Sequence, residues 1–285
     1  MVIESFISPF KAEKNPYELM FFGFFYSSIS ILLSMWIFQE YSSLLMVFLT
    51  VMACMPLMYN IMKSEEIKDT IFKSELKLLK EHGKAVEFLM FLFFGITIGY
   101  VFWYVLLPNY FQLGNFFFKV QKETLFAING RITNSVVRND IFVKILLNNI
   151  KVLIFCILFS FLFGLGAIFI LTWNSSVIAT ATGDFINNGL KEISKTTVNS
   201  ITGGYFSVVM AGFLRYMIHG IPEIAAYFVG GLAGGIISFA IAKHHFKTKK
   251  FENILLDSSE LIVIAILILV VAGLLEVFVT PIFFS

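Results

Sequence analysis

The sequence predicts an all-α protein: a polytopic transmembrane helical bundle of about seven spans with one broken or re-entrant element. Three observations lead to this fold class. Hydrophobic residues make up 58% of the 285 positions, and the mean hydropathy is +0.84. Charged residues make up only 14%, against about 25% in soluble domains. Apolar segments long enough to cross a bilayer, about 20 residues each, recur along the chain.

The spans are read from these apolar segments, and several carry interfacial aromatic residues at their ends, such as Trp36, Trp103 and Trp173. The stretch 175–188 is too short and too polar to cross, so we expect it to form a re-entrant or interfacial helix. The expected spans are 18–38, 41–62, 86–107, 150–173, 201–219, 222–242 and 260–283.

Lysines predict the orientation. Residues 63–84 carry six lysines and residues 243–250 carry four. Positively charged loops stay in the cytoplasm, so seven spans place the N-terminus inside and residues 109–148 outside. We divide the chain into two parts. Residues 1–84 form an N-terminal two-span hairpin plus a cytoplasmic amphipathic helix. Residues 85–285 form a membrane domain of about five spans with an extracytoplasmic helical segment at 108–149.

Two amphipathic stretches lie outside the expected spans. Residues 65–82 place Ile67, Ile71 and Leu78 on one helical face and charged residues on the other. We interpret this stretch as a helix on the cytoplasmic lipid surface, with a partner-docking helix as the alternative. Residues 115–129 form a similar stripe, which we interpret as a small cap that either contacts an outside partner or covers the bundle.

No motif for catalysis, metal binding or phosphate binding is recognisable. None of the histidines has zinc-type spacing with other ligands, and Cys54 and Cys156 lie in apolar runs, which is typical of buried free thiols. We therefore expect no catalytic residue, no metal, no cofactor, no enzyme activity and no nucleic-acid partner. The four histidines are His82, His219, His244 and His245.

Small residues four positions apart let transmembrane helices approach closely. We interpret these pairs as packing surfaces, with a substrate path as the alternative. The pairs are Gly95 and Gly99, Ser160 and Gly164, Gly230 and Gly234, and Gly231 and Gly235.

Ionisable side chains inside the apolar segments mark the candidate site. Such groups cost a few kcal/mol at membrane depth, so they are expected to be paired or to face a cavity. Arg215 and His219 lie four residues apart, on one helical face. Glu223 follows a break that we expect at Gly220 and Pro222. The polar cluster also includes Glu276, in the last span, and Asn174.

Two interpretations of this cluster remain open. In the structural one, Arg215 pairs with Glu223 or Glu276 and clamps the broken helix. In the functional one, the break is a proton- or solute-coupled site of the kind that transporters build at discontinuous helices.

Two longer motifs add a resemblance. Residues 148–186 combine an Asn-rich start with a glycine-spaced helix that ends at an Asn, and residues 213–240 contain His-Gly-x-x-Glu before a glycine-rich span. In this order they resemble the stage II sporulation protein M family over about residues 90–285, and residues 91–111 resemble its archaeal branch. Ser175 and Ile218 replace the usual Gly and Pro. The matching positions are Asn148, Asn149, Gly164, Gly166, Asn174, His219, Gly220, Glu223, Gly231 and Gly234.

The resemblance implies an integral membrane scaffold or assembly subunit without catalytic chemistry. The bacterial sporulation member is similar to a scaffold that recruits cell-wall hydrolases. We accordingly expect a multi-pass protein of the cell membrane that contacts the lipid bilayer, forms a homodimer and binds protein partners in the membrane or on its outer face. The alternative is a transporter or permease with its site at residues 215–223.

Overall fold

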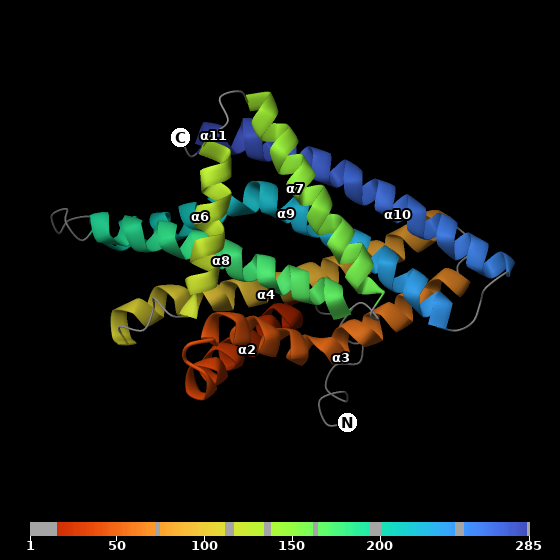
Figure 1. Ribbon diagram of the computed structural model, residues 1–285, viewed down its shortest axis with the longest axis horizontal. Coiled ribbons are helices and arrows are strands. Elements are labelled where there is room, and N and C mark those ends of the chain that lie inside the picture. Colours follow the sequence, from red (N-terminus) through yellow and green to blue (C-terminus); the bar gives the residue numbers. More distant parts are fainter. Residues whose placement is uncertain are drawn as a thin grey trace.

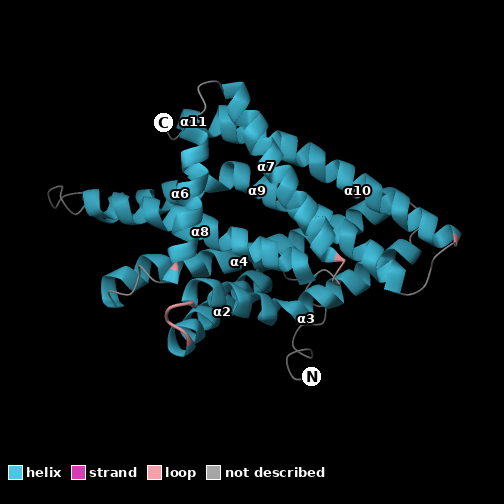
Figure 2. Ribbon diagram, viewed as in Figure 1, coloured by secondary structure: helices cyan, strands magenta, loops and turns pink. Residues whose placement is uncertain are grey.

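The computed structural model describes residues 16–71, 75–111, 117–133, 138–161, 165–193, 201–242 and 248–283. These ranges are helical apart from short turns, such as residues 38–41, and contain no strand (Figure 2). Helices are expected, because a spanning segment must satisfy its own backbone hydrogen bonds in lipid. The helices are α2 (Pro16–Ile37), α3 (Ser42–Ile71), α4 (Glu75–Phe111), α6 (Lys119–Thr133), α7 (Arg138–Ser160), α8 (Leu165–Ile193), α9 (Ile201–Ala242) and α10 (Lys249–Leu274), followed by the π-helical turn η1 (Leu275–Val279) and α11 (Thr280–Phe283).

The long helices lie side by side in one bundle (Figure 1). In this view α4, α8 and α9 form the middle, α2 and α3 lie on one side, and α7 and α10 lie on the other. The contacts agree: α8 touches α3, α4, α7 and α9, while α2 packs on α4 and α10 packs on α9. Helix α6 runs across the others near one end of the bundle (Figure 1). We call this the α6 end, and the opposite one the lysine end.

Six helices among the described residues are long and apolar enough to cross a membrane: α2, α3, α4, α7, α9 and α10. The predicted helical membrane bundle is therefore confirmed. Three of the expected spans differ from the structure: the fourth is divided between two helices, and the fifth and sixth form one helix. Residues 150–173 are not one span, because α7 ends at Ser160 and α8 begins at Leu165. Instead α7 starts at Arg138, inside the segment expected to lie outside the membrane.

The stretch 175–188 is not a separate re-entrant or interfacial helix. It belongs to α8, whose residues 170–187 are all buried or half-buried among neighbouring helices. Protein, not lipid, surrounds this helix, so its surface does not need to be apolar. Because of its polarity, the sequence analysis wrongly excluded this segment from the bundle, although it packs in the centre.

The expected break at Gly220 and Pro222 is also not found. Helix α9 runs without interruption through both residues for 42 residues, or about 63 Å at 1.5 Å per residue. Pro222 lacks an amide hydrogen, so the carbonyl of Ile218 has no donor at its usual position. The chain nevertheless stays helical, and the expected fifth and sixth spans form one element.

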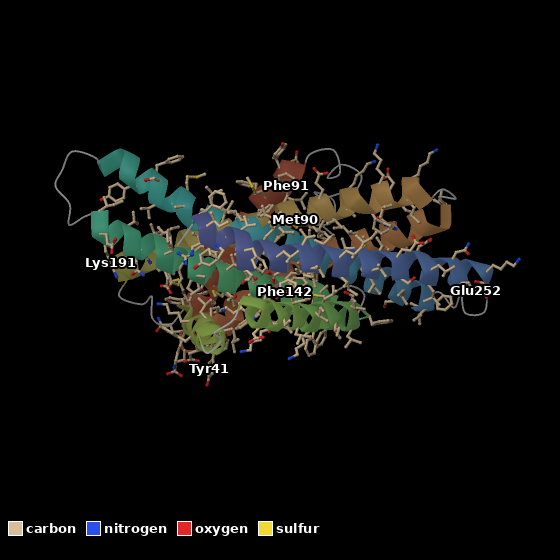
Figure 3. All side chains as sticks on the ribbon, turned by 90° about the horizontal axis from the view of Figure 1, so that it is seen from above. Tyr41, Met90, Phe91, Phe142, Lys191 and Glu252 are labelled. Atoms are coloured by element: carbon tan, nitrogen blue, oxygen red, sulfur yellow. The ribbon has the colours of Figure 1, made fainter. Side chains whose placement is uncertain are left out.

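The stretch 65–82 is divided between two helices and is not one surface helix. Helix α3 continues to Ile71, and α4 begins at Glu75. Figures 1 and 3 place the end of α3, the start of α4, the end of α9 and the start of α10 at the same end of the bundle. The described helix ends that border the two lysine-rich regions therefore lie at one end of the bundle.

Glycines allow direct contact between helix backbones at several crossings. A Cβ atom added to Gly234 of α9 would lie 2.6 Å from the carbonyl oxygen of Ile157 in α7. One added to Gly95 of α4 would collide with the Met20 backbone of α2. Gly231 faces the side chain of Ala167 at 3.0 Å. Gly230 and Gly235 face the side chains of Leu153 and Met62, respectively, while Gly164 lies outside the described residues.

Candidate functional site

The candidate site lies on one face of α9. Because α9 is continuous, Arg215, His219, Glu223 and Tyr227 follow one another at intervals of four residues and share that face. Tyr227 is fully buried, and the other three are half-buried. We call these four residues the α9 stripe.

The carboxylate of Glu223 is held by a neutral donor. The hydroxyl of Tyr227 donates a hydrogen bond of 2.8 Å to Oε1 of Glu223, one helical turn away. This contact satisfies one lone pair of the carboxylate without supplying a positive charge. Glu223 is thus positioned by its own helix.

Arg215 does not form the expected clamp. The structure describes Arg215, Glu223 and Glu276, and it contains no ion pair between Arg215 and either carboxylate. The guanidinium instead lies over the ring of Phe185 in α8, 5.4 Å from its centroid. A cation above an aromatic face is attracted by the ring quadrupole, so α8 supplies the contact that we expected from a carboxylate.

Glu276 reaches α9 from the last helical segment. It lies in η1, which follows α10 and contacts α9. The backbone N–H of Thr280 donates to the Leu275 carbonyl, and the Thr280 hydroxyl donates to the same carbonyl at 3.1 Å. Glu276 is close enough to Glu223 for the two carboxylates to interact electrostatically. Single π-turns inside helices are frequent at functional sites.

His219 joins the same region. Its Nδ1 atom lies 3.2 Å from the Thr280 hydroxyl, so α9 and the η1–α11 segment are connected by side chains as well as by packing. Asn174, which the sequence grouped with this cluster, donates its amide to the Ile170 carbonyl of its own helix at 3.1 Å. Gly220 is buried, with open space where a Cβ would lie, so no close contact requires a glycine there.

A groove of about 520 Å³ lies between the ends of α8 and α9, and it includes the Phe185 ring beneath Arg215. Glu223 is not among the residues lining it. The groove is lined by Phe185, Asn188, Gly189, Glu192, Ser207, Val208 and Ala211.

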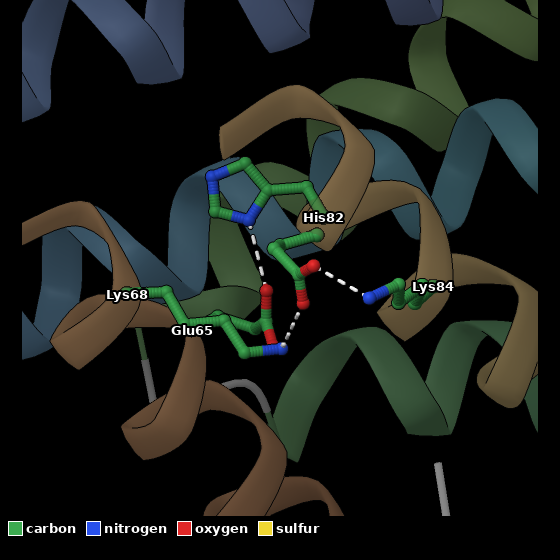
Figure 4. A network of polar contacts seen from close by, with 5 residues as sticks. Glu65, Lys68, His82 and Lys84 are labelled. Carbon is green, nitrogen blue, oxygen red and sulfur yellow. Dashed lines mark hydrogen bonds and ion pairs between the residues drawn. The ribbon is translucent and has the colours of Figure 1, made fainter. Parts of the chain in front are cut away.

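Sequence reasoning missed a charged cluster at the lysine end (Figure 4). Nδ1 of His82 lies 2.9 Å from Glu65, and Lys68 lies 2.8 Å from the other oxygen of Glu65. Lys68 also approaches Glu81 at 3.6 Å, and Lys84 binds Glu81 at 2.5 Å. Glu65 and His82 are almost completely buried. The i,i+3 spacing of Glu65 with Lys68 and of Glu81 with Lys84 was the available signal. We call these five residues the hairpin cluster.

A second missed contact joins α4 to α8. The hydroxyl of Tyr104 donates a short hydrogen bond to Asp184, and the ring of Tyr104 packs where a Gly183 side chain would lie. The ammonium of Lys122 in α6 lies 5.2 Å from the centroid of the same ring. Asp184 is therefore held by the bundle, and no sequence spacing connects it to Tyr104.

No group of three or more metal-ligating side chains occurs among the described residues. The fold and site define a polytopic helical membrane protein with ionisable residues inside its bundle. Among protein families, the one described as stage II sporulation protein M matches residues 124–281. The match covers more than half of the chain, so the protein belongs to this family. It includes α7 to α10 and the α9 stripe, and it excludes α2, α3 and α4. No curated protein and no solved structure matches the chain.

Proposed function

We propose that this protein is a scaffold or assembly subunit of the cell membrane without catalytic chemistry of its own. It would form a homodimer with its N-terminus in the cytoplasm, and it would bind protein partners in the membrane or on its outer face. Direct backbone contact at Gly95 and Gly234 carries this proposal. Helices that touch through their backbones resist sliding, because any displacement creates voids or clashes. A rigid body of this kind suits a platform for other proteins.

The experiment compares protein partners with solute movement. Native protein and two variants would be purified from native membranes in mild detergent, and co-purifying proteins would be quantified by mass spectrometry. We expect one partner in fixed ratio with the native protein and with Glu223→Gln, and its loss with Gly234→Leu, which separates α7 from α9. Equal partner recovery from all three samples, or no partner in fixed ratio, would contradict the scaffold.

A transporter remains the second candidate, favoured by one observation. Two carboxylates from different segments, Glu223 and Glu276, approach each other beside the π-helical turn, and His219 contacts Thr280 there. Paired acidic groups inside a bundle are typical of proton relays. In proteoliposomes, a pH-gradient-driven flux that Glu223→Gln abolishes while the bundle stays folded would favour transport over the scaffold.

A further inference from the structure

Arg215 is a half-buried cation for which the described residues supply no anionic partner. Its guanidinium lies 5.4 Å from the centroid of the Phe185 ring and forms no ion pair or hydrogen bond within the described part of the chain. Asp184 precedes Phe185 in α8, but its carboxylate accepts the hydrogen bond of Tyr104. A cation above an aromatic ring gains about 0.5–2 kcal/mol, whereas a guanidinium bound to an anion forms charge-assisted and often bidentate hydrogen bonds. The donors of Arg215 can therefore bind an external anion.

The groove between α8 and α9 reaches this guanidinium. Phe185, whose ring lies beneath Arg215, lines the groove, and so does Ala211, one helical turn before Arg215 on α9. Among the residues that line the groove, Glu192 is the acidic one, and it lies one turn pair beyond Phe185 on α8, or about 10 Å along the helix. The Arg215 end of the groove is thus the end that attracts an anion.

The position of Arg215 along α9 corresponds to a lipid headgroup layer. Helix α9 ends at Ala242, next to the lysine-rich residues 243–250, so Arg215 lies about 40 Å from the lysine end at 1.5 Å per residue. The hydrocarbon core of a bilayer is about 30 Å thick, and the bilayer is about 40–45 Å thick with its headgroups. If Ala242 lies at one headgroup layer, Arg215 therefore lies at the opposite one.

Aromatic residues at the same level support this position. Tyr104 of α4 binds Asp184, the neighbour of Phe185, and Trp103 precedes Tyr104 in the chain. Tyrosine and tryptophan are enriched where membrane helices meet the headgroups. Helix α6 contacts α8 and runs across the bundle here (Figure 1), and its Lys122 lies over the Tyr104 ring. Arg215 is thus placed where phospholipid phosphates lie.

We propose that the groove between α8 and α9 binds one anionic phospholipid and that Arg215 binds its phosphate. Phosphate oxygens match the planar fork of N–H donors that a guanidinium presents. A headgroup without an ammonium group keeps its negative charge beside the cation, whereas a phosphatidylcholine headgroup brings a positive charge of its own. Val208 and Ala211 offer apolar surface to the carbon atoms of the headgroup, and the exposed Asn188 offers an amide to its hydroxyls.

Native mass spectrometry of the whole protein in detergent tests this site with phosphatidylglycerol and phosphatidylcholine. We expect one phosphatidylglycerol to bind more tightly than phosphatidylcholine. Arg215→Gln should weaken phosphatidylglycerol binding about tenfold, because charge-assisted hydrogen bonds are lost. Lys122→Gln is the matched control, since Lys122 is also a half-buried cation above an aromatic ring, but that ring does not line the groove. Native-like binding by Arg215→Gln, or an equal loss with Lys122→Gln, would overturn the proposal.

Two further variants test the groove itself. Ala211→Trp fills the groove beside Arg215 and should weaken phosphatidylglycerol binding as strongly as Arg215→Gln does; undiminished binding would show that the lipid lies elsewhere. If both of these variants unfold, Asn188→Glu decides. Asn188 is exposed, so the fold should tolerate the change, and a negative charge in the groove should weaken phosphatidylglycerol binding several-fold. Unchanged binding by this variant would contradict the lipid site.

Inorganic phosphate distinguishes a lipid site from a site for a soluble anion. At the same concentration as phosphatidylglycerol, it should leave the bound lipid in place, because it lacks the contacts of the headgroup with the groove. Displacement of the lipid by inorganic phosphate would show that the groove binds a soluble phosphate, and the lipid proposal would be wrong.

Discussion

The hairpin cluster and the α9 stripe place charged residues inside the same bundle in different ways. In the hairpin cluster, Glu65 and Glu81 each contact a cationic partner, and a second helix supplies part of the contacts. In the α9 stripe, Glu223 accepts a hydrogen bond from the neutral Tyr227 hydroxyl, and Arg215 lies over an aromatic ring. Ion pairs in which each charge is compensated by its partner favour a fixed structure. A carboxylate that is hydrogen-bonded to a neutral donor can gain or lose a proton without breaking an ion pair. The hairpin cluster therefore favours a fixed structure, whereas the α9 stripe is the region that the transporter alternative would use.

The largest effect is expected in the hairpin cluster. Glu65→Leu removes the carboxylate shared by His82 and Lys68 and leaves buried groups uncompensated, so the free energy of unfolding should fall by about 3 kcal/mol. Denaturant unfolding in mixed micelles measures the change. The double variant Glu65→Leu, His82→Leu should recover part of the loss. A double variant as unstable as the sum of both single ones would show that the two residues do not act together.

Packing, not ion pairing, should hold α9 in place. Gly234→Leu forces a side chain against the Ile157 backbone, and we expect a loss of about 2 kcal/mol from overpacking. Val263→Leu is the matched control, because Val263 is 57% exposed on α10 and should tolerate the larger side chain. Detergent melting curves that do not distinguish the two variants would remove the role assigned to this glycine.

A smaller effect is expected within the α9 stripe. Because Arg215 and Glu223 form no ion pair, Arg215→Leu and Glu223→Leu should be additive within about 0.5 kcal/mol. Glu223→Leu and Tyr227→Phe should instead be coupled by about 1 kcal/mol, since they remove the same hydrogen bond. Double-variant cycles of unfolding measure both quantities. If Glu223→Leu rescues Arg215→Leu, the two residues do form an ion pair, and the α9 stripe does not differ from the hairpin cluster in this respect.

The least perturbing experiment places the two regions relative to the membrane. Lys77, near the hairpin cluster, is exposed, and Phe126 on α6 is 76% exposed. Single cysteines at these positions, in a background without Cys54 and Cys156, should react with an impermeant thiol reagent from opposite sides, with little change in stability. Labelling from the same side would contradict the predicted orientation of the lysine end.

Much of the fold follows from local sequence. Apolar length predicts α2 closely, but it misses that α3 continues to Ile71 and that α10 begins at Lys249. A four-residue spacing predicts that Arg215 and His219 share a face. The sequence analysis did not recognise α8 as a helix of the bundle, because hydropathy measures only how well a segment suits a lipid environment. A helix that is enclosed by other helices can be polar. The sequence analysis also divided α9 at Pro222, because proline has a low helix propensity. In the structure, the packing of neighbouring helices keeps α9 continuous.

By itself, the sequence determined that the chain is a membrane-embedded helical bundle of the stage II sporulation protein M family, since length, hydropathy and motif order are properties of the linear chain. Only the tertiary structure decided which polar groups meet. His82 and Glu65 come from different helices, Tyr104 meets Asp184 across 80 positions of sequence, and Gln121 reaches α3 and α8 from a helix that crosses them. Such contacts depend on how helices are placed beside one another, and that placement is set by packing rather than by the spacing of residues along the chain.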